Sequence, residues 1–375
     1  MLKSFVIFVS FVVIISFIIM KRHRTRQIML GNISIGGNAP ISVQSMTKTD
    51  TRDAEATLRQ IEELAGAGCE IIRVAVPDQA AARAFKTICS GSPLPVIADI
   101  HFDHRLALAA VKAGAAGLRI NPGNIGSDIK VKEVVLACRE HSIPIRVGAN
   151  EGSLGREMEA KYGGPTPRAL VESALKEVAV IEKAGYEEIK ISVKAFDVFT
   201  SREAYLLLAG ETDYPIHLGI TEAGSPLPGT VRSAIGIGML LDEGVGDTIR
   251  VSLSGPPIEE VRVGREILSV LGLRSYGPVI ISCPTCGRTV IDLLGLLREV
   301  EIRIAGLSNP ESLAGIKIAV MGCEVNGPGE AKSADIGIAG GRESALLFKG
   351  GEVIGRYPVA EIVDVLMSEL EAGLF

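Results

Sequence analysis

The sequence predicts an α/β fold, in which a TIM (β/α)8 barrel is followed by a small α+β domain. Two observations favour the barrel. From about residue 30, short β-branched runs alternate with amphipathic stretches, as in parallel βα units, and eight such runs are found. The composition, with 47% hydrophobic and 4% aromatic residues and 42 glycines, suits many short units joined by tight turns. The second domain is predicted because this alternation stops after residue 270.

The eight strands are expected at 41–45, 71–76, 95–100, 117–121, 143–149, 188–194, 215–220 and 247–253. The intervening stretches place apolar residues at helical spacing and often end in glycine, which helix carboxyl ends favour. The helix after the eighth strand is expected at 258–272. Eight evenly spaced units favour a closed barrel. A doubly wound open sheet is the alternative, and it would not need eight such units.

The remaining segments complete a division into an N-terminal leader (1–28), the barrel (29–272) and the second domain (273–375). In the second domain, helices are expected at 291–307 and 358–374, and strands at 316–322, 335–341 and 345–351. These elements predict an α+β unit of ordinary domain size.

The leader contains an apolar run at 4–20 followed by basic residues from Lys21 to Arg26. Its length is at the short limit of a membrane-spanning helix, and the basic flank would keep the rest of the chain cytoplasmic. The alternative is that translation starts at Met20 or Met29 and the run is never made. Membrane contact is therefore expected only if the leader is real.

Charge and cysteine usage narrow the class of protein further. The formal net charge is -5, which speaks against non-specific binding to nucleic acid. The six cysteines do not form the dense pattern of a disulfide-stabilised domain, so a reducing cytoplasm is expected.

Polar residues gather where the predicted strands end, which is the edge of a TIM barrel that carries its active site. Arginine matches phosphate oxygens in pairs and keeps its charge at working pH. A single arginine there would more often form an ion pair at the barrel rim. The set predicts a pocket for a diphosphate, formed by Arg73, Asp99, Arg119, Asn121, Arg146, Asn150, Lys194, Arg250 and Ser252.

Glu222 follows the seventh strand and faces the same predicted pocket. Its carboxyl group could donate or accept a proton at a bound substrate, or it could cap a helix. His101 and His217 lie at strand ends, and we assign neither a catalytic role.

The second domain carries Cys283-Pro-Thr-Cys286 and, after a folded stretch, Cys323-Glu-Val-Asn-Gly-Pro-Gly-Glu330. A C-x-x-C turn with a third thiol can hold a metal centre, but three thiolates are one ligand short of the usual four. A carboxylate from Glu324 or Glu330 would suit iron, and such an oxygen ligand is easily displaced. Zinc with three cysteines and a histidine, or reduced core cysteines without ligands, are the alternatives.

These motifs, CPTCGR and MGCEVNGPGE, resemble those of the GcpE (IspG) family of 4-hydroxy-3-methylbut-2-enyl diphosphate synthases. The resemblance continues from about Thr25 through PISVQSMT, VIADIHFD, LRINPGNIG, IPIRVGANEGSL, KISVKAFD and HLGITEAG. It implies a 4Fe-4S cluster held by Cys283, Cys286, Cys323 and Glu330, and an acid-base role for Glu222.

The resemblance also implies an activity and partners. The family reduces 2-C-methyl-D-erythritol 2,4-cyclodiphosphate to 4-hydroxy-3-methylbut-2-enyl diphosphate in the non-mevalonate (MEP) pathway of isoprenoid synthesis. Glu330 would be the exchangeable ligand of the cluster. It would have a catalytic role because its carboxylate would be displaced from the cluster when the substrate binds. The electron donor would be flavodoxin or ferredoxin, since no nucleotide-binding G-x-G-x-x-G follows a strand. A head-to-tail homodimer is implied as well.

Two rival functions stay open at this point. One is a pterin-synthase-like barrel transferase with a structural zinc knuckle, which would contain zinc and no iron. The other is a membrane-anchored iron-sulfur electron-relay protein, which would need no diphosphate pocket.

Overall fold

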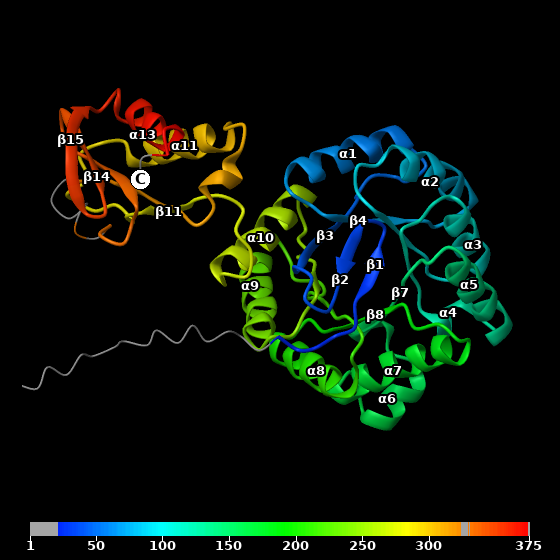
Figure 1. The fold of residues 1–375 in the computed structure, drawn as a ribbon. Coiled ribbons are helices and arrows are strands. Elements are labelled where there is room, and N and C mark those ends of the chain that lie inside the picture. The colour runs from blue at the N-terminus through cyan, green and yellow to red at the C-terminus, as the bar shows by residue number, and fades with distance from the viewer. Residues whose placement is uncertain (1–21, 324–328, 330, 374–375) are drawn as a thin grey trace, which may run out of the picture. The chain divides into compact units, whose positions relative to one another are not determined.

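The structure is a computed structural model that describes residues 22–323, 329 and 331–373. The chain divides into two compact units, one that ends at Ile267 and one that begins at Leu268. Figure 1 shows the helices and strands of both units.

Eight parallel strands form the wall of the first unit. They hydrogen-bond in the order β8-β7-β6-β5-β4-β3-β10-β9, and a parallel bridge between Ile191 and Ile216 joins the two ends. This closure confirms the predicted barrel over the open sheet. The last two strands are shorter than predicted, because the chain leaves the ladder where the loops of the pocket begin. The strands are β3 (Ser42–Met46), β4 (Ile71–Ala75), β5 (Val96–Asp99), β6 (Gly117–Arg119), β7 (Ile145–Asn150), β8 (Ile189–Lys194), β9 (His217–Leu218) and β10 (Thr248–Ile249).

Helices surround this wall (Figure 1), and many begin at a residue that caps them. The side chains of Asp53, Asp78, Asp103 and Asp197 each accept a hydrogen bond from a backbone N–H in the first turn of the following helix. The helices are α1 (Ala54–Gly66), α2 (Gln79–Gly91), α3 (His104–Lys112), α4 (Pro122–Ile125), α5 (Asp128–Glu140), α6 (Arg156–Tyr162), α7 (Pro167–Lys183), α8 (Val198–Glu211), α9 (Pro226–Asp242) and α10 (Pro257–Val270).

A β-hairpin that was not predicted packs against the amino-terminal ends of the barrel strands. Its strands, β1 (Ile28–Leu30) and β2 (Ile33–Ile35), are antiparallel and turn at Gly31, which has a φ of 59°. Buried apolar residues of the hairpin form a cluster with Ile71 of β4 and Ile97 of β5. The hairpin therefore covers the end of the barrel opposite the predicted pocket (Figure 1).

Residues 22–28 were expected to belong to the leader, but they contact the barrel. The Arg22 guanidinium lies 2.8 Å from the Asp247 carboxylate, and that of Arg26 lies 2.7 Å from Asp213. Across the described residues, no helix has both the length and the apolar character that a membrane span requires. The apolar run at 4–20 lies outside the described residues.

The second unit is built on a five-stranded sheet in the order β11-β12-β13-β14-β15. The first three strands are parallel, and the last three are antiparallel. Two of these strands, β11 and the exposed edge strand β15, were not predicted. The elements are β11 (Val279–Ser282), α11 (Leu293–Ala305), β12 (Lys317–Met321), β13 (Ile336–Gly340), β14 (Ser344–Lys349), β15 (Glu352–Pro358) and α13 (Ile362–Glu371).

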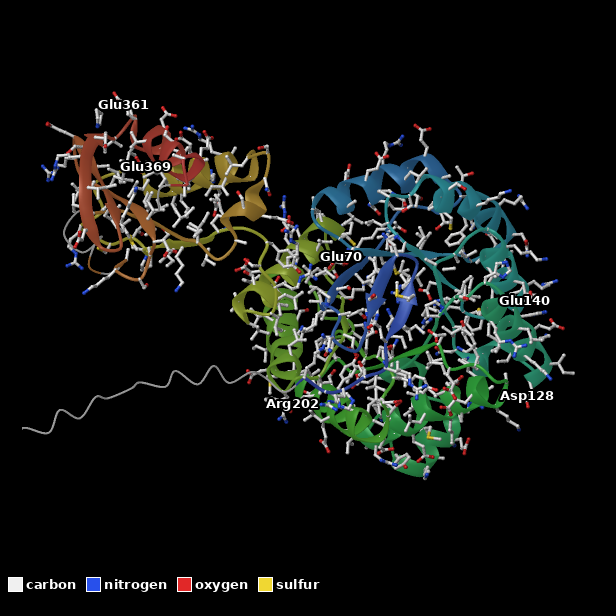
Figure 2. The ribbon with its side chains drawn as sticks, in the orientation of Figure 1. Glu70, Asp128, Glu140, Arg202, Glu361 and Glu369 are labelled. Atoms are coloured by element: carbon white, nitrogen blue, oxygen red, sulfur yellow. The ribbon has the colours of Figure 1, made fainter. Side chains whose placement is uncertain are left out.

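Side-chain alternation along β12 separates the two faces of this sheet. Ile318 and Val320 pack with buried residues of α11 and α13, whereas Ala319 and Met321 pack with a second cluster that contains Phe348. Charged side chains such as Glu369 of α13 lie at the surface of the unit, as those of Asp128 and Glu140 do on α5 (Figure 2). The helices thus fix one face of the sheet, and the cysteine loops follow the carboxyl ends of β11 and β12.

Candidate active site

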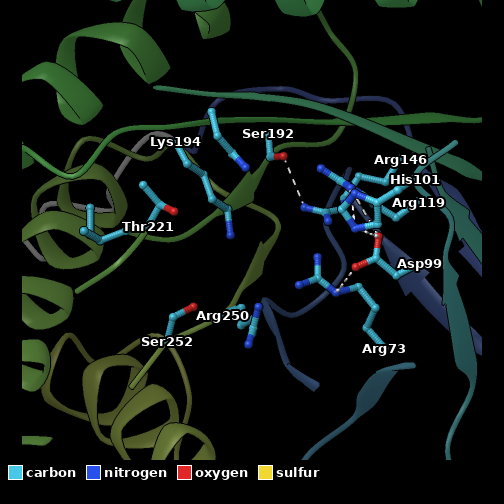
Figure 3. Close-up of a pocket in the computed structure, with 12 residues that line it drawn as sticks. Arg73, Asp99, His101, Arg119, Arg146, Ser192, Lys194, Thr221, Arg250 and Ser252 are labelled. Carbon is cyan, nitrogen blue, oxygen red and sulfur yellow. Dashed lines mark hydrogen bonds and ion pairs between the residues drawn. The ribbon is translucent and has the colours of Figure 1, made fainter. Parts of the chain in front are cut away.

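A polar pocket of about 250 Å³ lies at the carboxyl ends of the barrel strands (Figure 3). The strands β4 to β8, and the loops that follow β5, β9 and β10, supply its side chains. Of the nine residues predicted to bind substrate, all but Asn121 line it. The lining residues are Arg73, Asp99, His101, Arg119, Arg146, Asn150, Ser192, Lys194, Ile220, Thr221, Arg250 and Ser252.

The pocket carries a large excess of positive charge. Asp99 is the one carboxylate among its described lining residues, whereas five are cationic: Arg73, Arg119, Arg146, Lys194 and Arg250. Charges buried in a barrel interior are screened by water far less than charges at a surface. The arrangement therefore favours a small ligand with several negative charges.

Asp99 neutralises one side of the pocket. Its carboxylate lies 3.5 Å from Arg73 Nε and 3.3 Å from Arg119 Nη1, and His101 Nε2 is 3.7 Å away. Burial alone would raise the pKa of Asp99, but Arg73, His101 and Arg119 hold it well below its usual range. Burial lowers the pKa of Arg73 to about 10, against the attraction of Asp99. Asp99 is therefore ionised and orients two guanidinium groups.

The other side of the pocket lacks such a carboxylate. Arg146 Nη1 donates to Ser192 Oγ at 3.1 Å, and its buried Nε has no hydrogen-bond partner among the described residues. Burial lowers the pKa values of Arg146 and Lys194 well below their usual range, and neighbouring cations, Arg73 and Arg119 among them, add to this effect. In the described chain, no carboxylate lies within ion-pair distance of Lys194. An anionic ligand would supply the missing negative charge.

A second layer of polar residues lies deeper in the barrel wall. Lys190 and His217 are fully buried, and neither Lys190 Nζ nor His217 Nε2 has a partner among the described residues. Burial, followed by the charge of Arg146, lowers the pKa of Lys190 to about 7. His217 Nδ1 lies 2.8 Å from Thr248 Oγ1, and burial lowers the pKa of this imidazole well below its usual range. His217 is therefore a neutral residue of the barrel interior.

Two predicted residues lie near the pocket without lining it. Asn121 is buried, with its side-chain amide 3.0 Å from the Ile120 carbonyl oxygen and 3.2 Å from that of Gly148. Glu222 is exposed, directly follows Thr221 of the pocket and has a φ of 52°. A non-glycine residue in the left-handed region is strained, and such strain is concentrated at functional sites.

Three polar lining residues were not assigned a role from the sequence: His101, Ser192 and Thr221. Each lies at or just beyond the carboxyl end of a strand. That position groups all three with the polar residues expected at this edge of the barrel, although no binding role was predicted for them.

In the second unit, two of the three motif cysteines lie at one edge of the sheet. Cys283 directly follows β11, and Cys323 lies two residues after β12, the parallel neighbour of β11. The backbone N–H of Gly322 donates to Cys283 Sγ at 3.4 Å. The register of the two strands therefore brings the C-x-x-C loop and the Cys323 loop together.

The C-x-x-C loop folds back on itself. Thr285, between the two cysteines, has a φ of 64°, and Cys286 exchanges hydrogen bonds with Thr289, of 2.9 and 3.2 Å. A Cβ added at Gly322 would lie 2.9 Å from the Thr289 side chain, so this close approach requires glycine. The two loops are thus in direct contact.

Within the described residues, no three His, Cys, Asp or Glu side chains are placed so that they could hold a metal ion. Glu324 and Glu330 lie outside the described residues. Among the described residues, the two contacting loops carry the thiols of Cys283, Cys286 and Cys323. Thiolate sulfur that accepts backbone N–H bonds is the ligand type of an iron-sulfur cluster.

The fold and the pocket define a TIM-barrel protein that binds a multiply charged anion, joined to a unit with cysteine-bearing loops. The family model "GcpE TIM-barrel domain" matches residues 25–265, and "GcpE protein C-terminal domain" matches residues 279–372. The chain belongs to the GcpE family, which confirms the resemblance found in the sequence.

Similar proteins carry one name. The chain is 58% identical to "4-hydroxy-3-methylbut-2-en-1-yl diphosphate synthase (flavodoxin)" of Geobacter sulfurreducens, over 93% of this chain and 97% of that protein. It is 53% identical to the protein of the same name from Clostridium perfringens, over 94% and 99%. Among solved structures, dihydropteroate synthase of Yersinia pestis is 10% identical with a TM-score of 0.47, over 66% of this chain and 98% of that one. A score this low gives the pterin-synthase alternative no support.

Proposed function

We propose that the chain converts 2-C-methyl-D-erythritol 2,4-cyclodiphosphate to 4-hydroxy-3-methylbut-2-enyl diphosphate in the non-mevalonate pathway. The reaction takes up two electrons and two protons and releases one water. The observation that carries the proposal is the convergence of five cationic side chains on one pocket at the carboxyl end of the barrel. The name shared by relatives at 58% and 53% identity specifies the reaction.

The basic residues would hold the diphosphate while the ring opens. Arg146 and Lys194 have no carboxylate within ion-pair distance among the described residues, so they are the groups best able to bind phosphate oxygens. Arg250, which lies 3.7 Å from the Glu260 carboxylate, would bind beside them. Arg73 and Arg119 would bind from the side fixed by Asp99. Hydroxyl and amide donors would come from Ser192, Ser252 and Asn150, which also line the pocket. Asn121 would not contact the substrate, and its side chain would stabilise the backbone at the end of β6.

Glu222 would donate a proton to the oxygen that leaves as water. It is exposed beside the pocket residue Thr221, and its strained backbone supports a functional rather than a structural role. An exposed carboxyl group can exchange its proton with solvent, so it can be reprotonated for the next turnover.

The second unit would hold a 4Fe-4S cluster through Cys283, Cys286, Cys323 and Glu330. The contact between the two cysteine loops and the Gly322 N–H bond to Cys283 Sγ support the three thiolate ligands. The assignment of Glu330 rests on the sequence alone. When bound, the cluster would supply the electrons one at a time.

The electron donor would be flavodoxin, which the names of the relatives include. Ferredoxin is the other carrier of single electrons that the sequence suggests. We also propose a head-to-tail homodimer, which exposed apolar side chains of the barrel unit such as Phe102, Phe199 and Leu227 support. Sedimentation analysis of the purified chain would test this association.

The function is tested with protein purified without oxygen from a chain that starts at Met20. Iron and acid-labile sulfide are determined per chain, and reduction of the cyclodiphosphate is assayed with dithionite and a viologen. We expect about four iron atoms per chain together with turnover. Zinc without iron after anaerobic handling would contradict the cluster, and an iron-loaded chain without turnover would contradict the reaction.

A further inference from the structure

We propose that Glu260 is a positioning residue of the anion pocket: it orients Arg250 and fixes the loop that carries Ser252. Glu260 lies in the first turns of α10 and does not line the pocket. The proposal deepens the proposed function, because it concerns how the same pocket binds the diphosphate.

The Glu260 carboxylate is almost fully buried, yet four groups from three parts of the chain surround it. Oε1 lies 3.0 Å from Lys48 Nζ and accepts a hydrogen bond from the Leu253 backbone N–H at 3.0 Å. Oε2 lies 3.4 Å from Ser45 Oγ and 3.7 Å from Arg250 Nη2. One carboxylate therefore connects the end of β3, the loop after it and the loop after β10.

Lys48 strengthens the same connection from outside the pocket. Its ammonium group donates to the backbone carbonyl of Leu253 at 2.8 Å and to that of Gly255. Glu260 and Lys48 thus hold both the N–H and the carbonyl of Leu253, which directly follows Ser252 of the pocket. A loop fixed at both backbone groups presents its side chains with little freedom to move.

The contact with Arg250 gives Glu260 its effect on ligand binding. Arg250 is a lining residue, and its buried Nε has no partner within the described part of the chain. The 3.7 Å separation between Nη2 and the carboxylate is an ion pair without a tight hydrogen bond. Glu260 therefore attracts the guanidinium from behind, and donors remain for a phosphate in front.

Asp99 and Glu260 play unequal roles around the pocket. Asp99 lines the cavity and contacts two of its arginines, so its charge also reduces the attraction for an anion. Glu260 does not line the cavity, and its charge is partly neutralised by the ion pair with Lys48 outside the pocket. Loss of Glu260 is expected to weaken anion binding through disorder of Arg250.

The test is a double-mutant cycle with inorganic pyrophosphate as the probe, measured by calorimetry on the full-length protein. Glu260→Gln keeps an acceptor for the Leu253 N–H but removes the charge. It should weaken pyrophosphate binding about tenfold in the native background and less than twofold in the Arg250→Ala background, since the two residues act as one unit. Equal weakening in both backgrounds, or none in either, would overturn the positioning role.

Two further variants keep the test decisive. Glu260→Asp retains the charge and should recover part of the lost affinity, and it replaces Glu260→Gln in the cycle if that variant does not fold. Glu259→Gln is the matched control, because the neighbouring Glu259 is only partly buried, with its side chain 43% exposed, and pairs only with Arg262 among the described residues. It should leave pyrophosphate binding unchanged.

The cycle also separates this proposal from the proposed function. Coupling measured with pyrophosphate, in a protein that does not turn over the cyclodiphosphate, would retain the role of Glu260 and reject the reaction. Turnover without coupling would retain the reaction and reject the role. A wild-type chain that binds neither anion would contradict both.

Discussion

Arg119 and Asp99 stand directly opposite each other on neighbouring parallel strands, and their charged groups meet at 3.3 Å inside the barrel. The two side chains are 8% and 5% exposed. Because the register of β5 and β6 sets the pair, the same hydrogen bonds that build the barrel also position part of the pocket.

Replacement of Asp99 tests this pair. Asp99→Asn leaves two buried guanidinium groups without a carboxylate, so the free energy of unfolding at neutral pH should fall by about 3–5 kcal/mol. The pKa of Asp99 is lowered in the fold, so its stabilisation is present above the ordinary value and is lost as pH falls through the folded value. Urea unfolding should therefore show the difference between variant and wild type shrinking below about pH 4. A difference that stays constant into acid would contradict the ionised state of Asp99.

A substitution in the second unit should affect the cluster, whereas a substitution in the barrel should affect only substrate binding. Cys323→Ser should abolish the proposed 4Fe-4S cluster and all turnover. Arg119→Ala should keep the visible absorption of the cluster but raise KM for the cyclodiphosphate about tenfold or more, because one charged contact is lost. Absorption spectra and steady-state kinetics of both variants measure this. Full cluster content in Cys323→Ser would reject that ligand.

Anion binding should be accompanied by proton uptake at Lys194. Its pKa is lowered by burial and by neighbouring cations, so the amine loses its proton more readily in the free pocket. A polyanion favours the charged amine and raises this pKa, so protons bind with the ligand. Calorimetry of pyrophosphate in buffers with different ionisation enthalpies should show that uptake. It should decrease in Lys194→Met and persist in Lys132→Met, whose parent side chain is exposed on α5.

Gly219 should tolerate no side chain. A Cβ there would lie 2.7 Å from the Arg250 carbonyl oxygen and 2.7 Å from Lys194 Nζ, and the backbone oxygen cannot move away. Gly219→Ala should lower the free energy of unfolding by about 1–3 kcal/mol and weaken anion binding. The control is Gly238→Ala in α9, where the added Cβ meets no atom within 4 Å. It should stabilise the chain by about 0.5–1 kcal/mol, and thermal unfolding compares the two.

The barrel could be predicted because each βα unit carries its own local pattern. Alternation of β-branched runs with amphipathic stretches located all eight strands. Of the nine binding residues predicted from their places at strand ends, eight line one pocket. The hairpin β1–β2 and the edge strand β15 were missed for physical reasons. Two three-residue strands carry too little periodicity to detect, and β15 exposes side chains on both faces.

Contacts that depend on three-dimensional packing could not be predicted. Nothing in the sequence distinguishes the buried Glu260 from the partly exposed Glu259 beside it, since both lie at the start of one helix. The bond from Gly322 to Cys283 depends on the parallel pairing of two strands, one of which was not recognised. Asn121 had the right position at a strand end, but its amide is occupied by backbone carbonyl groups.

The hairpin that seals the amino-terminal end of the barrel has a kinetic consequence. Leu30 and Ile35 close that end with an apolar cluster, which offers water and protons no polar path to the interior. A ligand that fills the mouth would then isolate Lys190 and His217 from bulk solvent for as long as it stays bound. Lys190 and His217 would then keep, throughout a turnover, the protonation states that they had when the ligand entered.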